Sequence, residues 1–123
     1  ELNRVLKPGS QVLITVPYLW NLHDVPNDEF RYTPFSLKRI CEEAGFVVVK
    51  MEGLGGWYAS LATMLSCFAR RAPLSKFKRR IVTFMVFPLV KYLFKKDMLH
   101  YKSNNFSESQ MITGLKCVLT KQV

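Results

Sequence analysis

The chain has 123 residues, of which 49% are hydrophobic, and this suffices for one modest domain that buries roughly two-thirds of its unfolded surface. Its 18 Lys and Arg outnumber its 9 Asp and Glu, and the net charge of +9 makes an anionic surface a plausible neighbour. No run reaches the roughly 18 to 20 apolar residues that a membrane-spanning helix requires.

The cysteines argue against two kinds of site. Cys41, Cys67 and Cys117 lie far apart, are odd in number and show no CxxC spacing. This pattern disfavours both a disulfide framework and a zinc site, and it fits a reducing cytoplasm.

The first predicted elements are the end of a helix and a strand. Leu2, Val5 and Leu6 have helical spacing, and "KPGS" at 7–10 stops that helix. Because "ELNRVLK" reads as the tail of a helix, we expect further residues before it. "QVLITVP" at 11–17 is apolar with little alternation, which predicts a central strand covered on both faces, as in a parallel sheet.

A second helix and strand follow. Thr33 is a predicted N-cap with Pro34 as the first helical residue, and the helix runs to Gly45. Its predicted buried face consists of Leu37, Ile40, Cys41 and Ala44. "FVVVKM" from Phe46 predicts the next strand. Alternating helices and strands with short connections predict an α/β, doubly wound sheet, whose ligands sit beyond the carboxyl ends of the strands.

The later part of the chain is basic and apolar. Trp57, Leu61, Met64, Leu65 and Phe68 form one helical stripe, and "RRAPLSKFKRR" separates it from the apolar "IVTFMVFPLVKYLFKK". We expect two or more helices with extensive burial, Trp57 in the core and a kink at Pro88. A polar loop at 101–110 then leads to "GLKCVLTKQV", a predicted edge or antiparallel strand.

Three motifs in this order resemble a known family. "LKPG", then "HDVPNDEFRYT", then "EEAGF" are similar to the carboxyl-terminal half of class I S-adenosylmethionine-dependent methyltransferases, especially the group near the type 11 domain. The resemblance is close from about Leu2 to Ala59 and looser from Gly114 to Val123. It implies strands five to seven of a Rossmann-like sheet, the seventh antiparallel to its neighbours, formed by residues 1–56 and 112–123, with 57–98 as an inserted helical segment.

The resemblance also implies S-adenosylmethionine as cofactor and a small-molecule, lipid or glycan acceptor. The family's glycine-rich cofactor loop and its acidic ribose-binding residue would precede this chain, so we predict no cofactor-binding residues here and no activity from this chain alone. "GLGG" at 53–56 lacks the context of a phosphate loop.

The polar loop at 17–34 holds the predicted acceptor site. Transfer of a sulfonium methyl group depends mainly on alignment, but a base can remove the proton from an oxygen or nitrogen acceptor. We expect His23 to orient or deprotonate the acceptor and Asp28 and Arg31 to bind its polar groups. Apolar walls would come from Tyr18, Trp20 and Tyr32. Structural alternatives remain open: an Asp28–Arg31 pair, a hydrogen bond of His23 before the turn at Pro26, and core roles for the aromatic residues.

The segment 57–98 has two interpretations. It either packs on the sheet as a cap that shapes the acceptor pocket or lies peripherally on the anionic inner membrane surface, with lysines among the headgroups. The competing function is therefore a non-catalytic basic module that binds an anionic membrane. Nucleic acid is disfavoured, because the positive residues interleave with an apolar helix rather than with exposed aromatic residues on a strand or loop.

Overall fold

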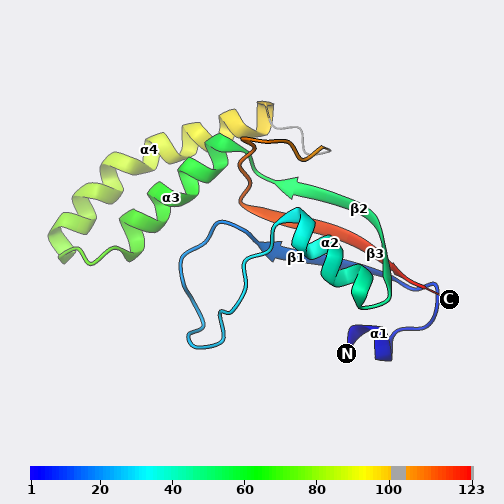
Figure 1. The fold of residues 1–123 in the computed structure, drawn as a ribbon. Helices are drawn as coiled ribbons and strands as arrows, with labels where there is room; N and C mark the ends of the chain where they lie inside the picture. Colours follow the sequence, from blue (N-terminus) through cyan, green and yellow to red (C-terminus); the bar gives the residue numbers. More distant parts are fainter. Residues whose placement is uncertain (101–104, 123) are drawn as a thin grey trace.

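The computed structural model describes residues 1–100 and 105–122, with the backbone alone at residues 99 and 100. Its elements run in the order α1 (Leu2–Val5), β1 (Gln11–Pro17), α2 (Pro34–Glu43), β2 (Phe46–Leu54), α3 (Trp57–Arg71), α4 (Lys76–His100) and β3 (Gly114–Lys121) (Figure 1). They form a small α/β fold with a three-stranded antiparallel sheet. Residues 101–104 of the predicted polar loop lie outside the described residues.

The last strand occupies the middle of the sheet. β3 pairs antiparallel with β1 on one side and with β2 on the other, so the strand order is β1-β3-β2. Gly114 of β3 lies opposite both Pro17 and Leu54, which places the carboxyl ends of β1 and β2 at the same end of the sheet. The prediction of an antiparallel final strand is confirmed, and its position is central.

The prediction that β1 is a central strand covered on both faces is wrong for the described part of the chain. β1 pairs with β3 alone there, and its residues alternate between exposed and half-buried positions. Leu13 is 60% exposed on the face that no helix covers. An unbroken apolar run therefore does not by itself reveal which face of a strand has a covering layer.

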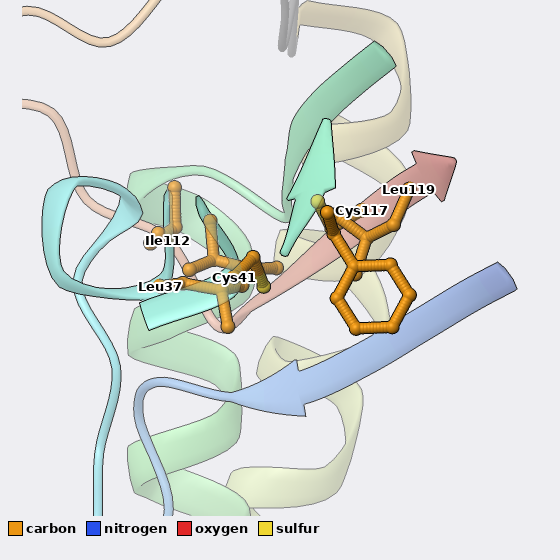
Figure 2. Packing of buried hydrophobic residues seen from close by; sticks show 7 residues of the cluster. Leu37, Cys41, Ile112, Cys117 and Leu119 are labelled. Atoms are coloured by element: carbon orange, nitrogen blue, oxygen red, sulfur yellow. The ribbon is translucent and has the colours of Figure 1, made fainter. Parts of the chain in front are cut away.

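One face of the sheet packs against α2. Leu37 and Cys41 of α2 meet Cys117 and Leu119 of β3, and Figure 2 shows these side chains converging with Ile112. The helix begins as predicted: Thr33 Oγ1 accepts a hydrogen bond from the Ser36 amide at 3.2 Å, and Pro34 is the first helical residue. Two members of the predicted buried face, Ile40 and Ala44, are exposed. The helix ends at Glu43, short of the predicted Gly45, so Ala44 is the C-cap residue beyond its last turn.

Hydrogen bonds fix the short α1 to the far end of the sheet. Asn3 Nδ2 donates to the Ala44 carbonyl at 2.7 Å, and Lys121 Nζ donates to the Asn3 carbonyl at 2.7 Å. Gly45 allows this contact, because it has φ +83° and a Cβ atom there would lie 2.7 Å from Asn3 Nδ2.

Helices α3 and α4 form a hairpin that extends away from the sheet (Figure 1). Small residues of α3, including Ala62, pack against Val90 and Leu93 of α4. The two helices are as predicted, and Pro88 lies inside α4, where the expected kink stays a prediction. The expected extensive burial of α4 is wrong within the described residues, where Phe84 and Met85 are exposed. The expected core position of Trp57 is also wrong: the stripe of Trp57, Leu61, Met64 and Phe68 is exposed, because α4 packs on the opposite, small-residue face of α3.

A buried carboxylate holds the base of the hairpin together. Asp97, near the end of α4, accepts hydrogen bonds from the amides of Gly56 and Ala59 at the start of α3, at 3.0 to 3.1 Å. These amides belong to the first turn of α3, where a helix has no internal acceptors for them. Within the described residues, no helix is long and apolar enough to cross a membrane.

Candidate functional site

The polar loop leaves the sheet at the carboxyl end of β1. The amides of Tyr18 and Leu19 both donate to the Thr113 carbonyl, at 2.9 and 3.0 Å, immediately before β3 begins. The α3–α4 hairpin leaves the same end of the sheet, after β2. Loop and hairpin therefore start side by side, and Cys67 of α3 lies 3.7 Å from the Asn21 side-chain oxygen of the loop.

Three of the predicted site residues form one cluster around Asp28. The Asp28 carboxylate accepts hydrogen bonds from both terminal nitrogens of Arg31, with Arg31 Nη2 at 2.6 Å from Oδ2. It also accepts from the His23 amide at 3.1 Å. The side chain of Asp28 is only 6% exposed. The Arg31 guanidinium, and secondarily these bonds from His23, hold the pKa of Asp28 well below its usual range.

Arg31 closes the loop on itself. Besides Asp28, it donates to the Phe30 carbonyl at 3.0 Å and to the Asn21 carbonyl at 3.3 Å. Asp28 and Arg31 therefore both hold residues 21–31 together. This agrees with the alternative in which the two side chains pair with each other for a structural purpose. Their role in binding an acceptor stays a prediction.

His23 is positioned by the same carboxylate. Its Nδ1 lies 3.0 Å from Asp28 Oδ2, and its side chain is 45% exposed. In the tautomer in which Nδ1 donates to Asp28, Nε2 carries the lone pair and can accept a proton. Arg31 Nη2 also lies 3.5 Å from Nδ1, so the ring is flanked by both members of the Asp28–Arg31 pair. A role of His23 as a general base stays a prediction.

The predicted aromatic walls do not share one surface. Tyr32 stacks on Phe30 with ring centroids 5.8 Å apart and packs partly against the core. Tyr18 also contacts the core and lines a cavity of about 140 Å³ beside Phe35 of α2. Trp20, which is 46% exposed, lies on the hairpin side of the loop.

Trp20 joins two hollows at the carboxyl end of β1. The larger, of about 340 Å³, lies over the ends of β1 and β2, and the smaller, of about 180 Å³, reaches Cys67, Arg70 and Arg71 of α3. Trp20 and Thr63 line both. Neither is lined by His23, Asp28 or Arg31.

Sequence reasoning missed the α3 residues of this groove and Asp97. Arg70 and Arg71 were visible only as part of a basic run, and nothing in their spacing indicated that they face the loop. Asp97 is the first acidic residue after the long stretch without acids from Trp57 to Lys96, a signal that could have marked it as structural.

Residues 52–56, at the end of β2, do not form a glycine-rich loop open to the amino acid end of S-adenosylmethionine. The glycines at 53–56 are engaged in packing: a Cβ at Gly55 would lie 2.8 Å from Thr113 Oγ1, and the Gly56 amide donates to Asp97. Glu52 near the end of β2 lies 2.8 Å from Lys50 Nζ and 3.9 Å from Lys116 Nζ. Glu52, Gly55 and Gly56 are thus engaged in contacts within the protein.

Comparison with known proteins found no matching family model, no matching curated protein and no matching solved structure.

Proposed function

We propose that this chain supplies the acceptor side of an S-adenosylmethionine-dependent methyltransferase that acts on a small-molecule, lipid or glycan acceptor. The observation that carries the proposal is the strand order β1-β3-β2, with β3 antiparallel to two strands that run parallel to each other. The resemblance of "LKPG", "HDVPNDEFRYT" and "EEAGF" implies this arrangement for the last three strands of the family's Rossmann-like sheet.

The position of the polar loop supports the same proposal. In open α/β sheets, ligands bind beyond the carboxyl ends of the parallel strands. The loop with His23 begins at that end of β1, next to the groove that Trp20 and α3 line. In this proposal His23 takes the proton from an acceptor hydroxyl or amine, and Asp28 acts as a positioning residue that orients its ring.

The uncovered parts of the sheet also fit the proposal. β1 has one strand partner among the described residues, and exposed Leu13 and Val47 lie on the sheet face away from α2. Exposed apolar strand surface of this kind normally receives another layer or strand. We propose that residues outside this chain complete the sheet there and contribute the cofactor loop.

Calorimetric titration with S-adenosylmethionine tests whether the cofactor site lies outside this chain. We expect no binding heat from the 123-residue chain and saturable binding by the product of the whole reading frame that encodes it. Binding by the chain alone would contradict the assignment of the cofactor site to other residues. An absence of binding by the whole product would contradict the methyltransferase proposal.

A further inference from the structure

The positive charge of the protein is concentrated in the hairpin. The stretch from Trp57 to Lys96 contains nine of the 18 Lys and Arg and none of the nine Asp and Glu, so it carries the whole net charge of +9. The first acid after it, Asp97, is buried against the start of α3. The surface of the hairpin is therefore strongly positive.

The same hairpin exposes a large apolar face on α4. The helix packs on α3 through Val86, Val90 and Leu93. Phe84 and Met85, on other sides of the helix, are 83% and 70% exposed. The exposed hydrophobic side chains at helical spacing on the face away from α3 are Phe77, Ile81, Phe84, Met85 and Tyr92.

Charge and apolar surface alternate along α4. Residues 81–90 contain no charged side chain, whereas Lys and Arg flank them at 76–80 and at 91–96. Lys91 Nζ lies 4.9 Å from the centre of the Phe87 ring, so the lysine stem runs along apolar surface. On a membrane interface, the apolar middle of the exposed face would enter the acyl boundary, and the Lys and Arg side chains at both ends of the helix would extend to the phosphates.

We propose that α4 docks this protein onto an anionic lipid surface. The apolar face enters the boundary between headgroups and acyl chains, and the flanking Lys and Arg contact lipid phosphates. A second copy of the chain is a poorer occupant, because it would bring two hairpins of the same strong positive charge together. This inference stands independently of the methyltransferase proposal.

Vesicle co-sedimentation tests whether the Lys and Arg side chains of the hairpin bind anionic lipid. We expect the chain to bind phosphatidylcholine vesicles that contain one quarter phosphatidylglycerol, to leave pure phosphatidylcholine vesicles unbound, and to dissociate as salt is raised. The variant Lys76→Gln/Lys78→Gln/Arg80→Gln should lower the partition coefficient about 10- to 100-fold. The control Lys7→Gln/Lys38→Gln/Arg39→Gln removes the same charge from exposed sites outside the hairpin and should change it far less.

A second pair of variants tests whether the exposed apolar side chains of α4 contribute to vesicle binding. Phe84→Gln/Met85→Gln should weaken vesicle binding at least tenfold while leaving the circular dichroism spectrum unchanged, because both side chains are exposed. Leu22→Gln/Phe35→Gln makes the same kind of change outside the hairpin and should leave binding intact. Equal binding to neutral vesicles, or equal losses in the two lysine–arginine variants, would overturn the proposal. The proposal would also be overturned if the protein formed a dimer that binds no vesicles and if Phe84→Gln/Met85→Gln dissociated that dimer.

Discussion

Asp28 links His23 and Arg31 across the polar loop. Its carboxylate joins Arg31 to the backbone and ring of His23. We expect Asp28→Asn to loosen residues 21–31 and to raise the rate of trypsin cleavage after Arg31 several-fold, because a neutral amide holds the guanidinium less strongly. Asp24→Asn, an exposed position in the same loop, is the matched control and should cleave as the wild type does.

The lowered pKa of Asp28 gives the loop a defined pH dependence. The folded state binds this proton less readily than the unfolded state, so the carboxylate contributes stability above its ordinary pKa of about 4. That contribution is lost as the pH falls below this value toward the lowered pKa. Protection of the Arg31–Tyr32 bond should therefore persist from neutral pH to about 4 and then decrease, as followed by an acid-active protease or by hydrogen exchange. Protection that declines already near pH 6 would contradict the assignment to Asp28.

The three thiols should differ in reactivity. Cys41 and Cys117 are buried in the core, and burial raises the pKa of Cys117 to about 11. Cys67 is half-buried on α3. We expect iodoacetamide at neutral pH to label Cys67 in the native chain and to reach the other two only after denaturation, with mass spectrometry of the peptides as the readout. Native labelling of Cys117 at the rate of Cys67 would show that the core is packed differently.

At the scale of elements, the hairpin depends on a contact between its two ends. Asp97→Ala removes an acceptor from the first-turn amides of α3 and leaves them buried, so we expect the free energy of unfolding to fall by about 2 kcal/mol in a urea titration. Asp97→Asn retains one acceptor oxygen and should lose about half as much. An Ala variant as stable as the wild type would mean that the carboxylate does not hold the hairpin base.

Local signals predicted the elements well and their burial poorly. The strand at 11–17, the cap at Thr33 and the separate helices of the hairpin follow from apolar runs, capping chemistry and Pro or Gly positions, which act within a few residues. Whether Leu13 or Trp57 is covered depends on which distant segment packs against it. The sequence spacing of a stripe cannot specify that partner.

At the scale of the whole molecule, the candidate site was predicted in part. Loop position and residue type indicated His23, Asp28 and Arg31, and the structure brings these three together. The cap interpretation placed the segment 57–98 beside an acceptor pocket, but it did not identify which α3 residues line the groove with Trp20, because they lie more than forty positions along the chain. Long-range placement of this kind depends on the path of the loop and on the direction in which the hairpin leaves the sheet.

In the proposed function, the loop after β1 receives the methyl acceptor. The most direct measurement is transfer of a tritiated methyl group from S-adenosylmethionine by the product of the whole reading frame, supplied with lipid, glycan and small-molecule fractions. We expect transfer to one fraction and a loss of turnover of about 100-fold or more in His23→Ala, without loss of cofactor binding. Absence of transfer to every fraction, or full turnover in His23→Ala, would contradict it.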